Sequence, residues 1–200
     1  MSGDYIPAAV LIPLLVAAKK NTAGGTASGC SGPGTLRLRT RDDGIEHLPD
    51  DTEVLLTVRT HTVEHHRGQI SFPGGAVEPT DASHEAAALR ETFEEIGLAP
   101  DRVKILAELP EIPTVASRFR VRPFVGIVQG RPELDPNPHE IGEILMVPLR
   151  HLLDAQHSTT EIFEREGLRI PMKVYYFGPH RIWGATALML QILLEKFIES

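Results

Sequence analysis

The segment from Asp81 to Gly97 constrains the fold of this chain more than any other part of the sequence. Thr80 or Asp81 can cap its start, and Gly97 can end it in the left-handed conformation that glycine adopts without strain. At about 100° per residue, one stripe of the segment is apolar, and it consists of Leu89, Phe93 and Ile96. We therefore expect an amphipathic helix that packs this stripe against the core.

Acidic side chains lie on the opposite side of the predicted helix, within an arc of about 100°. They are Glu91, Glu94 and Glu95. Glu91 and Glu95 lie one helical turn apart, where like charges repel and destabilise a helix. A charged surface of this kind usually does no more than keep a protein in solution. A divalent cation such as Mg²⁺ would instead offset the repulsion, because it prefers carboxylate oxygens.

The rest of the chain alternates short apolar runs with loops, which predicts an α+β fold with helices on the faces of a mixed sheet. Strands are predicted at residues 8–18, 36–40, 54–59, 103–108, 118–128 and 144–148, with a strand pair within 167–177. Further helical segments are predicted at residues 149–155 and 186–198. The predicted loops cover residues 19–34, 60–75 and 131–139, and the first is expected to be flexible because it is rich in Gly, Ser and Thr.

Length and composition argue against several classes of protein. The chain has 200 residues, which suits one domain over residues 1–200. Its formal net charge of −7 disfavours a nucleic-acid partner, and its apolar runs are too short to cross a membrane. Cys30 is the only cysteine, which fits a reducing, cytoplasmic compartment. We expect a monomer or a homodimer that acts on a small molecule.

The helix and the residues before it form a longer pattern, made up of Gly75, Asp81, Arg90, Glu91, Glu94, Glu95 and Gly97. This pattern closely resembles the Nudix box, the motif of the Nudix hydrolase superfamily. Asp81 stands where the box has Glu, eight residues instead of seven separate it from Arg90, and Thr92 replaces an apolar residue. The resemblance implies a Nudix-type α/β/α sandwich with a mixed sheet and the hydrolysis of a pyrophosphate bond.

The resemblance also implies roles for particular residues. The implied ligands of Mg²⁺ or Mn²⁺ are Glu91, Glu94 and Glu95. Arg90 would hold these carboxylates in place through its guanidinium fork. Gly74 and Gly75 would let the backbone turn sharply beside the metal ion. The general base is left open between Glu140, in the later loop, and Glu94.

A second pattern lies upstream and consists of Leu55, Leu56, Thr57, Arg59, Thr60, Gly68, Phe72, Pro73, Gly74 and Gly75. Its spacing resembles the signature of the coenzyme A pyrophosphatase branch of the Nudix family. Thr60 replaces a Ser, and Glu64 replaces the second Arg of the signature, whose task the nearby Arg67 could take. Segments 8–14, 137–140 and 182–187 are similar to the same branch. The implied substrate-binding residues are Arg59, Thr60, Arg67, Gly74 and Gly75.

For coenzyme A the implied products are 3′,5′-ADP and 4′-phosphopantetheine, and Arg59 suits a phosphate because arginine binds phosphate through a bidentate fork. Two alternatives stay open. One is a Nudix hydrolase for another nucleoside diphosphate derivative, such as ADP-ribose or a dinucleotide, which Glu64 favours. The other is a Nudix-like domain that binds a nucleotide without cutting it, which the intact acidic residues disfavour. Trp183 is predicted to lie in the core rather than to stack on a base.

Overall fold

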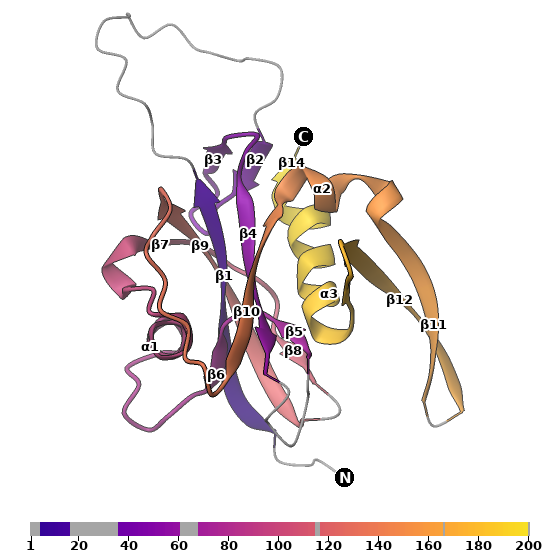
Figure 1. Ribbon diagram of the computed structural model, residues 1–200, viewed down its shortest axis with the longest axis horizontal. Coiled ribbons are helices and arrows are strands. Elements are labelled where there is room, and N and C mark those ends of the chain that lie inside the picture. Colours follow the sequence, from indigo (N-terminus) through magenta and orange to yellow (C-terminus); the bar gives the residue numbers. More distant parts are fainter. Residues whose placement is uncertain (1–4, 17–35, 61–67, 115–116, 166, 200) are drawn as a thin grey trace, which may run out of the picture.

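The computed structural model describes residues 5–16, 36–60, 68–114, 117–165 and 167–199. A sheet stands at the centre, with α1 (His84–Ile96) against one face and α3 (Gly184–Ile192) against the other (Figure 1). This is the α+β sandwich with a mixed sheet that the sequence predicted. The loop predicted at residues 19–34 lies outside the described residues, and so do Glu64 and Arg67.

The central sheet is mixed because its middle strand β1 (Ile6–Val16) has antiparallel β4 on one side and parallel β9 on the other. The main strands follow the order β10 (Ile141–Pro148), β4 (Glu53–Arg59), β1, β9 (Phe119–Gln129) and β7 (Val103–Glu108). Three short strands pair with β4, β1 and β9 respectively, namely β5 (Ile70–Ser71), β6 (Gly74–Ala76) and β8 (Ile112–Pro113). The prediction of a loop over residues 60–75 is wrong at β5 and β6, because strands this short show no period.

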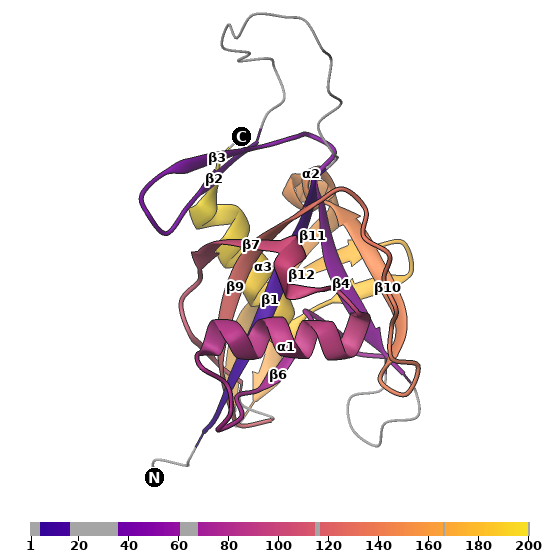
Figure 2. The same cartoon turned by 90° about the vertical axis from the view of Figure 1, so that its left-hand side faces the viewer.

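The two faces of β1 contribute to two separate clusters of the core. Leu11 and Leu15 pack in the cluster that contains Ala88 of α1, whereas Ile12 packs in the cluster that contains Leu190 of α3. Successive residues of a strand point to opposite faces, so a strand that is covered on both faces is apolar at nearly every position. This explains the continuous apolar run of β1. Figure 2 looks onto the α1 side, where the helix crosses in front of the sheet.

A second sheet extends beyond α3, and the sequence predicted it only in part (Figure 1). A short helix, α2 (Leu149–Leu153), leads from β10 toward it. Its strands are β11 (Ser158–Arg165), β12 (Leu168–Phe177) and β13 (His180–Ile182). The strand pair predicted within 167–177 is instead the single strand β12, which pairs with β11. Most residues of β11 are polar or charged, so it offers no apolar run that sequence analysis could detect.

The terminal helix ends earlier than predicted. One π-helical turn at Leu193–Phe197 follows α3. β14 (Ile198–Glu199) then pairs with β2 (Leu36–Arg39), and β2 pairs with β3 (Ile45–Leu48). In the described part of the chain, no helix is long and apolar enough to cross a membrane.

Candidate functional site

Small side chains bring α1 close to the sheet. Its buried residues are Ala87, Ala88, Thr92, Glu95 and Ile96. Phe93 is 52% exposed, and Leu89 is only partly buried. The Thr92 hydroxyl donates to the Ala88 carbonyl at 2.6 Å, which satisfies it inside the core. The predicted apolar stripe is therefore wrong at Phe93, whereas Leu89 and Ile96 pack against the core as predicted. The closest part of the helix to the sheet is formed by small residues such as Ala87 and Ala88.

The start of α1 also differs from the prediction. The N-cap is Ser83, whose hydroxyl accepts a hydrogen bond from the Ala86 N–H at 3.1 Å. Asp81 lies before the helix and does not cap it, because its carboxylate accepts the Glu78 N–H at 2.8 Å and binds a side chain of α1. A serine directly before a helical run is an ordinary capping signal that the sequence analysis missed. The end of the helix is as predicted, with Gly97 in the left-handed region at φ 71°.

Arg90 ties the segment before α1 to the acidic side of the helix. Its Nε and Nη2 each donate to Asp81 at 3.0 Å. Its Nη1 donates to Glu91 at 3.0 Å and to Glu94 at 3.1 Å, and Nη2 also reaches the Ala76 carbonyl at 3.2 Å. These bonds raise the pKa of Arg90, with Asp81 as the main cause, and lower that of Asp81. Arg90 thus stays charged and fixes the orientation of its carboxylate neighbours.

Glu95 is a buried carboxylate, although its place in the sequence suggested the solvent-facing side of the helix. Its Oε2 accepts the Gly74 N–H at 3.2 Å, and the Arg59 guanidinium lies 3.5 Å from its Oε1. The pKa of Glu95 is raised to about 7, mainly by burial and further by the nearby charges of Glu140 and Glu91, although the contacts with Gly74 and Arg59 lower it. Arg59, predicted to bind substrate, therefore lies directly beside an acidic residue of the helix.

Glu91 is partly buried, and its pKa is also raised. Burial is the main cause, Arg90 opposes it, and the negative charges of Glu94 and Glu140 add to it. Glu140 thus lies close enough to both Glu91 and Glu95 to influence their ionisation. The fold brings this later loop and the helix together in one site.

Two glycines make room for the acidic side chains. At Gly75, a Cβ atom would lie 2.5 Å from Glu91 Oε2, so any side chain there would displace this carboxylate. At Gly74, φ is 148° and a Cβ atom would lie 2.3 Å from the Ala9 carbonyl oxygen of β1. Only glycine allows backbones to approach this closely. Both residues therefore shape the site through space and backbone rather than through a side chain.

Thr60 holds the later loop against the end of β4. Its N–H donates to the Glu140 carbonyl at 2.9 Å, and its hydroxyl donates to the His139 carbonyl at 3.1 Å. Thr60 was predicted to bind substrate, and the structure shows it anchoring the segment that carries Glu140. Arg67, the other residue of that prediction, lies outside the described residues.

The donor chemistry of the site fits a divalent cation. The nearby oxygen donors are the carboxylates of Glu91, Glu94, Glu95 and Glu140. Burial and mutual repulsion disfavour the charged forms of Glu91 and Glu95, and a cation would reverse this. Within the described ranges, no three acidic, histidine or cysteine side chains already form a metal cage. Mg²⁺ does not require one, because it usually keeps several waters and takes the rest of its ligands from one or two carboxylates and substrate phosphates.

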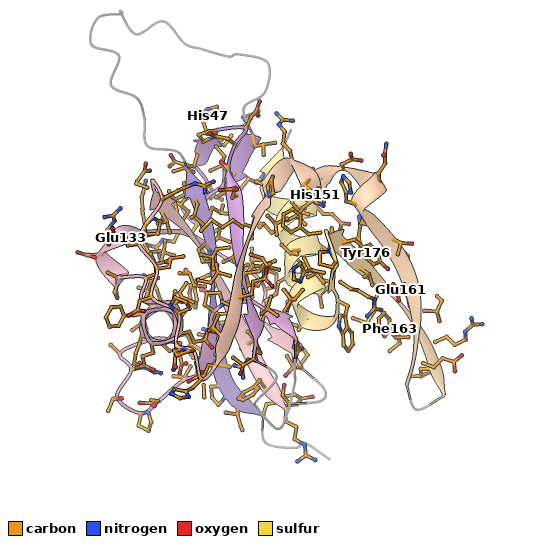
Figure 3. All side chains as sticks on the ribbon, viewed as in Figure 1. His47, Glu133, His151, Glu161, Phe163 and Tyr176 are labelled. Atoms are coloured by element: carbon orange, nitrogen blue, oxygen red, sulfur yellow. The ribbon has the colours of Figure 1, made fainter. Side chains whose placement is uncertain are left out.

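Trp183 lies away from this site and is not a core residue. It is 44% exposed, and its ring stacks on Phe163 with a centroid separation of 5.6 Å. Arg181 lies over both rings and pairs with Glu161. Figure 3 shows Glu161 and Phe163 on the second sheet, which lies on the other side of the central sheet from α1. The core prediction for Trp183 is wrong, because its neighbours come from an outlying hairpin that the sequence did not reveal.

The chain is similar to several known proteins. A family model described as the NUDIX domain matches residues 40–166. A mitochondrial coenzyme A diphosphatase of Homo sapiens is 35% identical over 171 residues, covering 80% of this chain and 72% of that protein. A Nudix hydrolase of Photorhabdus laumondii is 34% identical, covering 72% and 76% respectively. A solved MutT/nudix family protein from Enterococcus faecalis shares the fold, with a TM-score of 0.52 and 15% identity over 96% of this chain and 62% of that one.

Proposed function

The chain belongs to the Nudix hydrolase family, and we propose that its substrate is coenzyme A or a coenzyme A derivative. Hydrolysis of the pyrophosphate bond would give 3′,5′-ADP and 4′-phosphopantetheine. One observation carries the proposal: Arg59, from the upstream pattern, lies 3.5 Å from Glu95, from the helix pattern. This contact supports the proposal because it brings residues of the two sequence patterns together. The likeness to a human coenzyme A diphosphatase supports the same substrate.

The proposed mechanism gives each residue a task. Mg²⁺ or Mn²⁺, held by Glu91, Glu94 and Glu95, would supply Lewis-acid chemistry and lower the pKa of a bound water. Arg90 keeps Glu91 and Glu94 in position through its two Nη1 hydrogen bonds. Arg59 offers its guanidinium fork to a substrate phosphate.

Glu140 is the proposed general base. It lies in the loop before β10, and this loop is joined to the acidic helix by the hydrogen bond from the Asn137 N–H to the Glu95 carbonyl at 2.9 Å. A base must lie within hydrogen-bond reach of the proton that it accepts, and a residue on a different segment from the metal ligands suits this task. Glu94 is the alternative, since it is exposed and on the same helix.

A second substrate class is favoured by one residue. Glu64 reverses the charge of the second Arg in the coenzyme A signature. The substrate would then be another nucleoside diphosphate derivative, such as ADP-ribose or a dinucleotide.

We also propose a cytoplasmic location, on the basis of the single cysteine.

A product assay separates these possibilities. The full chain would be incubated with Mg²⁺ or Mn²⁺ and, separately, coenzyme A, ADP-ribose and NADH, and the products identified by mass. We expect 3′,5′-ADP and 4′-phosphopantetheine from coenzyme A, and none when EDTA replaces the metal. Faster cleavage of ADP-ribose or NADH would favour the second class. Binding of a nucleotide without metal-dependent products would show a non-catalytic domain.

A further inference from the structure

The loop before β10 is fixed to the last turn of α1 by its backbone. The Asp135 N–H donates to the Ile96 carbonyl, and the Asn137 N–H donates to the Glu95 carbonyl, both at 2.9 Å. The last carbonyls of a helix have no partner within the helix, so the loop supplies partners that the helix lacks. One of these bonds joins Asn137 to the backbone of Glu95, a residue of the site.

Both polar atoms of the Asn137 side chain make hydrogen bonds within the loop. Its Nδ2 donates to Glu140 Oε1 at 3.2 Å, and its Oδ1 accepts the His139 N–H at 3.1 Å. Its carbonyl accepts the N–H groups of Glu140 and Ile141, at 3.0 and 2.8 Å. Asn137 is therefore hydrogen-bonded both to the helix that carries Glu91, Glu94 and Glu95 and to the carboxylate of Glu140.

We infer that Asn137 is a positioning residue that holds the Glu140 carboxylate toward α1, an inference that rests on the proposed function. Glu140 needs such a residue because its negative charge is repelled by the acidic residues of α1. The loop that carries Glu140 is hydrogen-bonded to the backbone of Glu95, and like charges at short range repel, so a free Glu140 side chain would turn toward solvent. A hydrogen bond to an ionised group is stronger than one between neutral groups, and the Asn137 amide opposes that turn.

Asn137→Asp distinguishes this role from a purely structural one. Asp keeps the oxygen that accepts the His139 N–H and keeps the turn, since Asn and Asp both favour such turns. It replaces the donor to Glu140 with a carboxylate oxygen. We expect kcat to fall at least about tenfold, a part of what a general base contributes, with KM changed less than about threefold and an unchanged melting temperature. Glu133→Ala is the matched control, because this exposed residue of the same loop lies on the outer side of the molecule (Figure 3).

A double-mutant cycle tests whether Asn137 acts through Glu140. In a Glu140→Ala background, Asn137→Asp should lower kcat by no more than about twofold, because the group that it positions is gone. Full kcat in the single variant, or an equal loss in both backgrounds, would overturn the inference. If the wild-type chain cleaves none of the substrates, the proposed function fails, and crystal structures decide the inference separately. Asn137→Asp must then move the Glu140 carboxylate, and an unmoved carboxylate refutes the positioning role.

Discussion

α1 and α3 cover opposite faces of the same sheet, but different interactions hold them there (Figure 1). α1 begins at a serine cap and is fixed by the hydrogen bonds of Arg90 and by the buried Glu95. α3 follows Trp183, which makes no side-chain cap bond, and it packs through apolar residues such as Leu190. The polar contacts of α1 also place the acidic residues of the site, whereas the contacts of α3 mainly bury apolar surface. The contrast suggests that mutations can separate activity from stability.

The largest effect on activity is expected on the α1 face. Glu95→Gln should lower kcat at least about a hundredfold, the scale of losing one electrostatic stabiliser, and Glu91→Gln should do the same. Glutamine keeps the size of the side chain and can still accept the Gly74 N–H, so the fold should survive. Steady-state kinetics and thermal melting measure both effects. Glu85→Gln is the control on the same helix, because its pair with Arg41 is exposed. Near-normal turnover in both site variants would remove these residues from the site.

The largest effect on stability is expected on the α3 face. Leu190 is fully buried, and Leu190→Ala should lower the free energy of unfolding by about 2–5 kcal/mol, from lost burial and the cavity left behind. The folded fraction should keep its kcat. Urea denaturation measures the change, and Leu188→Ala, at an exposed position of the same helix, should change it by less than about 1 kcal/mol. A tenfold loss of kcat with unchanged stability would contradict the division between the two faces.

Substrate recognition is also expected to depend on a residue on the α1 side of the sheet, Arg59. If Arg59 binds the 3′-phosphate, Arg59→Ala should lower kcat/KM for coenzyme A by about tenfold to a hundredfold, the value of one charge-assisted hydrogen bond. Dephospho-coenzyme A, which lacks that phosphate, should be affected much less. Arg169→Ala, on the exposed hairpin beyond α3, serves as the control. Equal losses for both substrates would assign Arg59 to the pyrophosphate, and no loss for either would remove it from recognition.

The smallest effect concerns how α1 begins. Ser83→Ala should lower the free energy of unfolding by about 1 kcal/mol, because the Ala86 N–H loses its partner. Ser83→Asp should restore most of this stability, since aspartate caps helices about as well as serine. Denaturant titration of the two variants measures the difference. Equal stability of Ser83→Ala and the wild-type chain would show that the contacts of Arg90 hold the helix start without the cap.

The sequence predicted the parts of the fold that have a clear period. The central strands were located because they are apolar runs bounded by loops, and α1 was located because its apolar residues recur regularly and Gly97 marks its end. β11 was missed because its sequence is mainly polar, although all of it pairs with β12. The contacts of Arg90 with Glu91 and Glu94 were also predictable, since spacing within one helix fixes which side chains are neighbours.

The environment of the site residues was not predictable in the same way. The helical projection assigned Glu91, Glu94 and Glu95 to the side opposite the core, yet Glu95 is buried because Gly74 and Arg59 offer it partners from other segments. The same projection assigned Phe93 to the core, where the sheet in fact meets Ala87 and Ala88. Which side of a helix faces a sheet depends on how closely the two backbones approach, and that distance is set by residues distant in the sequence.

The parallel pairing of β1 with β9 affects how the protein is made. Ile6 lies opposite Phe119, so the centre of the sheet requires two segments that the ribosome produces far apart in time. Contacts this distant in sequence must overcome a large loss of chain entropy before they form, which slows folding. A nascent chain that already contains the acidic helix would still lack β9 beside β1 and the loop that carries Glu140. Until those segments emerge, apolar β1 residues such as Leu11 and Ile12 are open to aggregation or to a chaperone.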